Sequence, residues 1–370
     1  MRMASTARTH GRRRLGVLIV GAAILTTLMT VTAAAAPPVE APAGLTRPGT
    51  TTPIASPSSL SGTRPRTPIP GFLLKRGRYT RFDAPDAVQQ TNPFGINNRG
   101  VIVGKYTTAD GVDHGFRRDA RGRFTTIDFP GGVPTQLNKI NHRGQIVGRY
   151  ETIPGVYSFR GFLLTDGRLV RLDVPGAMYT QPLGINNRGQ VVGEYRTPDG
   201  RTHGFRWERG RFTTIDKPGA PATSLIDIND RGQILGATAD PADGAGLAAL
   251  RPFVLDRGRF VSFRAPDAPA TIPYDLNNRG QIVGYTAAPT ATDPFLAGAR
   301  GFLLARGAKG PFTPVDVPGA PRTIAYGLND TGAIVGQYEN TAAQPSPQRA
   351  GMQPPRLMRQ GDLAAVVSDT

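Results

Sequence analysis

The 370-residue chain contains 44 lysines and arginines against 27 aspartates and glutamates, which gives a formal net charge of +17. It contains no cysteine, so disulfides and thiol chemistry are excluded. An excess of positive charge can attract an anionic partner, and whether it does depends on where the charges lie.

The first 36 residues predict a targeting segment. Arg2, Arg8 and an arginine run at 12–14 precede an uncharged stretch at 15–36 that ends in small alanines. Such a pattern is typical of a secretory signal peptide. The uncharged stretch is also about long enough to span a bilayer, so an uncleaved membrane anchor is the alternative. Both interpretations place the protein outside the cytoplasm, either secreted or on the cell surface.

Three further regions follow the targeting segment. Residues 37–70 are rich in proline, threonine and serine and have no hydrophobic period, which predicts an extended linker. Residues 71–338 carry repeated strand patterns and are long enough for one closed domain. Residues 339–370 return to polar, proline-containing sequence and form a predicted tail, whose 356–367 stretch resembles a degenerate hairpin.

The repeat is built around a hairpin whose clearest copy is GINNRGQVVGEY at 184–195. Two short apolar strands flank the turn sequence NNRG, in which the first Asn can bond its own backbone and Gly tolerates a positive φ. Five other copies keep this turn chemistry. They are INNRG at 96, INHRG at 140, INDRG at 228, LNNRG at 276 and LNDTG at 328.

A second hairpin alternates with the first. GFLLTDGRLVRLD at 161–173 has an apolar strand, a DG turn and another strand, and its relatives start at residues 71, 115, 204, 252 and 301. The shared Phe recurs every 43 to 49 residues. Two hairpins per period predict the four strands of a propeller blade, and the absence of helical periodicity excludes helical repeats.

We therefore predict an all-β fold, a six-bladed β-propeller of four-stranded antiparallel blades. The first complete hairpin, 71–83, is of the second type, and the last, 324–338, is of the first type. Pairing these two would complete one blade from both ends and close the ring. The alternative is seven blades, with the 357–367 stretch used for closure.

The repeat also resembles a known family. HGF at 114–116 and 203–205, with INNRGQVVG and a strand ending in DxPG, is similar to the HAF-type extracellular repeat of bacterial secreted proteins. The resemblance covers the whole repeat region, although Gly replaces the family's middle Ala and four copies lack the His. It implies an extracellular, propeller-like protein and brings no settled activity with it.

Arginine is concentrated in the turns. One turn site of the first hairpin is Arg in five blades: Arg99, Arg143, Arg188, Arg231 and Arg279. The second turns hold ten more: Arg76, Arg78, Arg121, Arg123, Arg168, Arg209, Arg211, Arg257, Arg259 and Arg306. In a propeller both kinds of turn emerge on one face, so we expect a basic rim there.

Two interpretations of this rim remain open. Exposed turns commonly carry solvated charges, and the preference for Arg over Lys fits the base composition of a genome. Alternatively, the rim docks an anionic polymer such as a teichoic acid or an acidic polysaccharide of the cell surface. We do not expect nucleic acid as a partner, because the protein is exported and these turns have almost no aromatic residues for base stacking. Contact with a membrane is expected only through an uncleaved N-terminal segment, and we expect a monomer.

Signals for catalysis or cofactors are few. No zinc-binding spacing, P-loop, dinucleotide fingerprint or GxSxG motif occurs, so we expect no metal and no cofactor. His114 and His203 occupy equivalent sites in different blades and are expected to be structural. A recurring DxP aspartate should bond backbone donors of the turn that follows it. These acids are Asp83, Asp128, Asp173, Asp216 and Asp316.

Positions that break the repeat give the candidate ligand site. Before the IN motif, Lys139, Asp227 and Asp275 interrupt a column of glycines on the predicted innermost strand. Arg264 replaces the DxP aspartate, and the connections at 237–251 and 286–300 are longer than their counterparts. We therefore predict that Asp227 and Asp275 line the central opening, and that Arg264 and the long connections cover the same sector on the face opposite the rim. Asp227, Asp275, Lys139 and Arg264 would bind a small cationic or hydroxyl-rich ligand there. Alternatively, these acids pair with Lys139 inside the channel.

Two functions are consistent with these patterns. The first is an extracellular, non-enzymatic binding or scaffold module that docks on an anionic cell-surface polymer or glycan. The second is a propeller enzyme, a hydrolase or lyase acting on carbohydrate or lactone, with Asp227 and Asp275 as acid and base. The absence of a recognisable catalytic motif favours the first.

Overall fold

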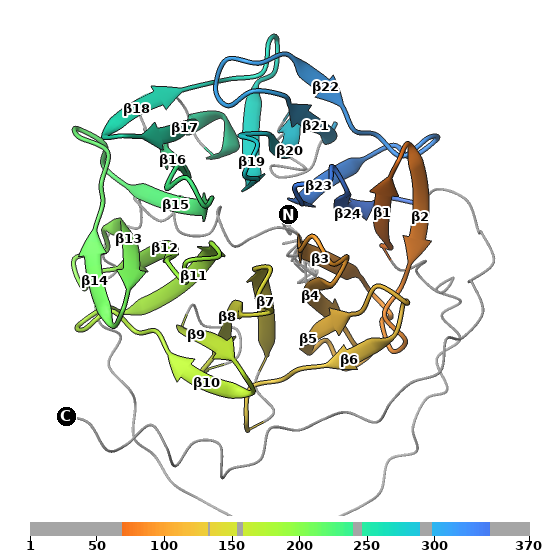
Figure 1. Cartoon of the computed structure of the whole chain (residues 1–370), viewed down its shortest axis with the longest axis horizontal. Helices are drawn as coiled ribbons and strands as arrows, with labels where there is room; N and C mark the ends of the chain where they lie inside the picture. The colour runs from red at the N-terminus through yellow and green to blue at the C-terminus, as the bar shows by residue number, and fades with distance from the viewer. Residues whose placement is uncertain (1–68, 132–133, 154–157, 240–245, 289–297, 341–370) are drawn as a thin grey trace, which may run out of the picture.

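The computed structural model describes residues 69–131, 134–153, 158–239, 246–288 and 298–340. The predicted signal peptide or anchor lies outside these residues, as does most of the predicted linker and tail. Within the described residues the protein is an all-β propeller in which six four-stranded antiparallel sheets surround a central axis (Figure 1). The same residues include a short 3-10 helix, η2 (Gly246–Ala249), and no helix that is long and apolar enough to cross a bilayer.

We number the blades in chain order and give their strands from the axis outward. Blade 1 contains β3 (Thr91–Ile96), β4 (Ile102–Thr107), β5 (Asp113–Arg118) and β6 (Phe124–Thr126). Blade 2 contains β7 (Thr135–Ile140), β8 (Ile146–Glu151), β9 (Phe159–Thr165) and β10 (Arg168–Arg171). Blade 3 contains β11 (Tyr179–Ile185), β12 (Val191–Arg196), β13 (Thr202–Glu208) and β14 (Arg211–Thr214).

The remaining blades follow the same order. Blade 4 contains β15 (Thr223–Ile228), β16 (Ile234–Ala239), β17 (Leu250–Asp256) and β18 (Arg259–Ser262). Blade 5 contains β19 (Ala270–Leu276), β20 (Ile282–Ala287), β21 (Arg300–Leu304) and β22 (Phe312–Pro314). Blade 6 contains β23 (Thr323–Leu328), β24 (Ile334–Tyr338), β1 (Gly71–Lys75) and β2 (Arg78–Phe82).

Blade 6 closes the ring from both ends of the repeat region. β1 pairs antiparallel with β24, with Phe72 opposite Gly336, so β1 and β2 are its two outer strands (Figure 1). A parallel bridge between Ile69 and Gln90 adds a contact to blade 1. The prediction of six blades with a shared closing blade is confirmed, and the seven-blade alternative is wrong.

Each blade has the same core contact between its second and third strands. The third strand carries a buried Phe that lies opposite a Gly of the second strand, as Phe72 lies opposite Gly336. A Cβ on Gly336 would lie 2.7 Å from the Phe72 ring and 1.9 Å from the carbonyl oxygen of Ile324. The recurring GF and VG pairs of the sequence therefore mark the place where an aromatic ring packs directly on the backbone.

The chain direction defines two faces of the disc. The first strand of each blade runs toward a turn of the first type and the third strand runs toward a turn of the second type, so both turns lie on one face. We call this the turn face. The links between the second and third strands and between successive blades lie on the opposite face, which we call the connection face. Gly71 and Tyr338, the first and last strand residues, both lie at the connection face.

Candidate functional site

The first turns of all six blades are joined in a closed ring of hydrogen bonds around the axis. In each blade the turn Asn caps its own turn, as Asn229 Oδ1 accepts from the backbone N–H groups of Arg231 and Gln233. Its Nδ2 then donates to the backbone carbonyl of the corresponding Asn in the next blade. The members are Asn97, Asn141, Asn186, Asn229, Asn277 and Asn329, at N···O distances of 3.0 to 3.2 Å.

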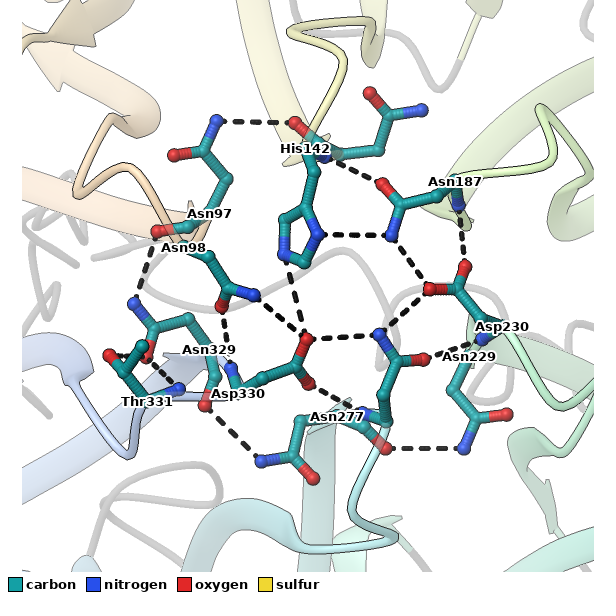
Figure 2. A network of polar contacts seen from close by, with 12 residues as sticks. Asn97, Asn98, His142, Asn187, Asn229, Asp230, Asn277, Asn329, Asp330 and Thr331 are labelled. Carbon is teal, nitrogen blue, oxygen red and sulfur yellow. Dashed lines mark hydrogen bonds and ion pairs between the residues drawn. The ribbon is translucent and has the colours of Figure 1, made fainter.

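A second ring, formed by the residue after each of these Asn, fills the mouth of the channel on the turn face. Figure 2 shows His142, Asn187, Asp230 and Asp330 pointing toward one another at the axis. Asp230 accepts from the backbone and side chain of Asn187 at 2.8 and 2.7 Å. His142 Nε2 lies 3.6 Å from Asp330 Oδ2, across the mouth. Asn98 and Asn278 complete the ring, and the polar groups largely satisfy one another.

Lys139, Asp227 and Asp275 meet beneath this mouth, from blades 2, 4 and 5. Lys139 Nζ lies 2.8 Å from Asp227 Oδ2 and also contacts Asp275 Oδ1. The other oxygen of Asp275 accepts from the backbone N–H of Leu328 at 2.7 Å, and Asp227 Oδ2 accepts from Leu276 N–H at 2.9 Å. All three side chains are buried. The alternative in which the acids pair with Lys139 inside the channel is thus what the structure shows.

Glycines of the same column explain why only three blades carry a side chain here. A Cβ on Gly184 would lie 2.6 Å from the Cα of Asp227 and 2.7 Å from its Oδ1. The inner strands approach too closely for every blade to contribute. The triad therefore occupies the space that its neighbours leave by being Gly.

The protonation of the triad follows from its burial. Burial raises the pKa of Asp275 well above its usual range, the cation of Lys139 opposes this rise, and the Asp227 carboxylate adds to it. Burial by itself lowers the pKa of Lys139, but the two carboxylates outweigh this and raise it on balance. A protonated Asp275 removes one negative charge from the buried triad, which reduces the cost of burying it.

The raised pKa of Asp275 makes stability depend on pH. The unfolded chain titrates this group near pH ~3.9, whereas the folded chain holds the proton to higher pH. The stabilisation is therefore complete below pH ~4 and is lost as the pH rises through the folded pKa. We expect the unfolding free energy of the wild type to fall, relative to that of Asp275→Asn, as the pH is raised from 4 to 8. Urea unfolding of both proteins across this range would show it, and a constant difference would contradict it.

The space at the channel mouth is small. The cavity above the triad has a volume of about 50 Å³ and is lined by the triad and by both rings. Ligand pockets usually measure roughly 300 Å³ or more. In this arrangement the cavity has room for water or a small ion, and a sugar does not fit.

Arg264 lies elsewhere. It follows β18 on the connection face, where its guanidinium donates to the carbonyls of Ala268 and Pro269 at 3.1 and 2.6 Å. The cavity beside Asp227 and Asp275 opens among the first turns, on the side of the basic rim. Asp227 and Asp275 thus line the central opening and Arg264 lies on the face opposite the rim, but the structure does not bring Arg264 together with these acids.

The first-turn arginines surround this mouth on the turn face. Arg99, Arg143, Arg188, Arg231 and Arg279 are all exposed. The ten second-turn arginines are exposed as well. Among the described residues, one of these fifteen side chains forms an ion pair. Arg123 Nε lies 2.8 Å from Asp119 Oδ2.

Basic side chains on the connection face are paired far more often. There the described residues form six contacts between basic and acidic side chains. They are Arg81–Asp83, Lys105–Asp113, His114–Asp128, His203–Asp216, Arg300–Asp316 and Arg322–Glu339. Four lysines and arginines of the connection face thus lie beside a carboxylate, compared with one of the fifteen turn-face arginines.

The DxP aspartates and the two histidines form a structural unit on the connection face. His114 Nδ1 lies 2.8 Å from Asp128, and its ring stacks on Tyr106 with centroids 5.4 Å apart. Asp128 Oδ1 accepts from the backbone N–H of Gly115 on the neighbouring strand. The expectation that the aspartate bonds the following turn is wrong here, because Thr135 Oγ1 accepts from that turn's Phe129 N–H instead. Blade 3 repeats the arrangement with His203 and Asp216.

The contacts between blades at the channel mouth were not predicted. The turn Asn was expected to bond its own backbone, and its Oδ1 atom does so, as Asn97 shows. The Nδ2 atoms reach the next blade. A turn residue that is Asn in all six copies, where Asp, Ser or Gly would also suit the turn, was the available signal.

Comparison with known proteins identifies the fold and no family. No family model matches the chain, and no curated protein matches its sequence. Solved structures do match, and the fold of the chain is similar to that of a putative TolB from Agrobacterium tumefaciens. The TM-score is 0.52 at 12% identity, and the match covers 74% of this chain and 99% of that one.

Two further solved structures match with lower TM-scores. Aleuria aurantia lectin, in complex with α-methyl-L-fucoside, has a TM-score of 0.41 and 13% identity, covering 65% of this chain and 83% of the lectin. AofleA from Arthrobotrys oligospora has a TM-score of 0.42 and 14% identity, covering 66% and 77%. At these identities the TolB match supports the fold alone.

Proposed function

We propose that this protein is an extracellular, non-enzymatic binding module that docks on an anionic cell-surface polymer through its turn face. The observation that carries the proposal is the uneven pairing of charge. Fifteen exposed arginines lie on the turn face, and among the described residues one of them forms an ion pair, whereas Arg81, Lys105, Arg300 and Arg322 of the connection face each lie beside a carboxylate. A surface of like charges raises the local concentration of counter-ions and of anionic ligands.

The shape of the turn face favours binding over catalysis. The enzyme alternative needs Asp227 and Asp275 to reach a substrate as acid and base. Both are buried, both contact Lys139, and the cavity above them has about 50 Å³. A carbohydrate or lactone cannot approach them without opening two hydrogen-bonded rings.

Export and membership of the HAF-type repeat family form part of the same proposal. The basic, uncharged and small-residue pattern of residues 1–36 supports a signal peptide or an anchor. The HGF and DxPG pairs support the family, because His114 and His203 each bond the DxP aspartate of their own blade. A teichoic acid or an acidic polysaccharide would then be within reach of the turn face.

Two variants of equal charge test the docking surface. The first changes Arg99, Arg143, Arg188, Arg231 and Arg279 to Gln. The second changes five connection-face arginines to Gln, namely Arg160, Arg171, Arg201, Arg300 and Arg322. On an anionic matrix we expect the first variant to elute at clearly lower salt than the second, because its lost charges all faced the matrix.

The equal net charge of the variants isolates the effect of position. Thermal unfolding would first establish that both variants fold. Elution of both at the same salt concentration would mean that only the total charge matters, and the proposed docking face would be wrong.

A further inference from the structure

Three arginines of the second turns have an unfavourable backbone conformation. Arg76, Arg209 and Arg257 have φ values of 52°, 50° and 49°, in the left-handed region, and each is followed by a Gly that also has positive φ. Two-residue turns of this kind favour Asn, Asp or Gly at the first position, because a longer side chain adds steric strain there. Blade 2 follows the preference, with Asp166 at φ 50°.

Nothing inside the protein compensates this strain. The three arginine side chains are exposed and form no hydrogen bond or ion pair with another described residue. The residue after each Gly is again an exposed arginine, Arg78, Arg211 or Arg259. Strain at exposed residues with no internal contact is a reason to look for a role outside the fold.

The cations also repeat from blade to blade. Blades 6, 3 and 4 each present the same Arg-Gly-Arg turn at the outer edge of one face. The cavity described on this face lies at the axis and is lined by carboxylates and amides. Binding by such equivalent, separate sites becomes strong only when one ligand engages several of them together.

We infer that the turn face binds a linear polyanion that is long enough to contact several blades at once, and that Arg76, Arg209 and Arg257 are among its contact residues. This inference rests on the proposed function and narrows its ligand class. A single anionic group or a short oligomer reaches one turn, so it gains nothing from the neighbouring blades.

The chain length of the ligand is the first test. Tripolyphosphate and long-chain polyphosphate, compared at equal phosphate concentration by titration calorimetry, should differ at least about tenfold in affinity per phosphate. If neither binds, the proposed function itself is overturned. If both bind with equal affinity per phosphate, an anion-binding face remains and the polymer inference is overturned.

The three strained arginines are the second test. In Arg76→Asn/Arg209→Asn/Arg257→Asn, affinity for long-chain polyphosphate should fall about tenfold, while the melting temperature should rise because Asn tolerates the left-handed region. A control of equal charge, Arg160→Gln/Arg171→Gln/Arg201→Gln, should keep most of the affinity. Equal affinity of the two variants would remove the three arginines from the contact surface. A melting temperature that does not rise would overturn the strain argument.

Discussion

Replacing Lys139 with Ala should lower the unfolding free energy by about 3–5 kcal/mol, the range measured when one partner of a buried ion pair is removed. The change leaves Asp227 and Asp275 facing each other in a buried channel without the cation that contacts both. Burial already raises the pKa of Asp275, and the loss of Lys139 would raise it further. Urea unfolding at neutral pH measures the effect.

A neutral version of the triad provides the control. In Lys139→Met/Asp227→Asn/Asp275→Asn the charges are absent, and the Asn oxygens can still accept from the backbone N–H groups of Leu276 and Leu328. Replacing a whole buried ion cluster is often nearly neutral. We expect this variant to recover most of the loss. A Lys139→Ala protein as stable as the wild type would mean that the triad does not hold the channel together.

Gly336→Ala should be the most damaging conservative change in the closing blade, at about 3 kcal/mol. Its new Cβ would lie 1.9 Å from the carbonyl oxygen of Ile324 and 2.7 Å from the Phe72 ring. The backbone oxygen has little freedom to move, so β24 must shift away from β23 or Phe72 must leave the core. Either movement opens the pairing of β1 with β24 on which ring closure depends.

Gly332→Ala is the matched comparison for this prediction. Gly332 belongs to the same blade, has φ 84° and has open space where a Cβ would lie. Backbone strain alone should cost this variant roughly 1 kcal/mol. Thermal unfolding of both proteins checks the order, and a Gly332→Ala protein less stable than Gly336→Ala would contradict the steric explanation.

The fold could be predicted because its information is local and repeated. Variants of the turn sequence after Ile185 recur in every blade, and the Gly-Phe pair at 204–205 recurs in five of the six, so each hairpin was recognisable alone. Ring closure could also be predicted, because each end of the repeat region contributes one hairpin, half a blade, and the two halves complement each other. The repeat fixed the number of blades even though Phe72 and Gly336 are far apart in sequence.

The candidate site was harder to predict because its geometry depends on how far each side chain lies along the channel from the first turns. The sequence singled out Lys139, Asp227 and Asp275 as departures from a glycine column, and the structure brings them together. It could not show that the column lies directly beneath the turns, nor that Arg264 bonds its own loop on the other face. A bulge in each inner strand, as between Leu137 and Lys139, sets this position, and single sequences carry no clear signal for it.

The first and last strands of the described disc end side by side. The backbone N–H of Tyr338 donates to the carbonyl of Pro70 at 3.3 Å, so these two residues are neighbours behind the arginine-bearing side. A molecule attached through a short link at either residue, on a bead or a sensor chip, would present its cations outward. Such an attachment would orient the protein with its turn face toward the solution. Binding of a dissolved polyanion to the turn face could then be measured, because the support would lie behind the opposite face.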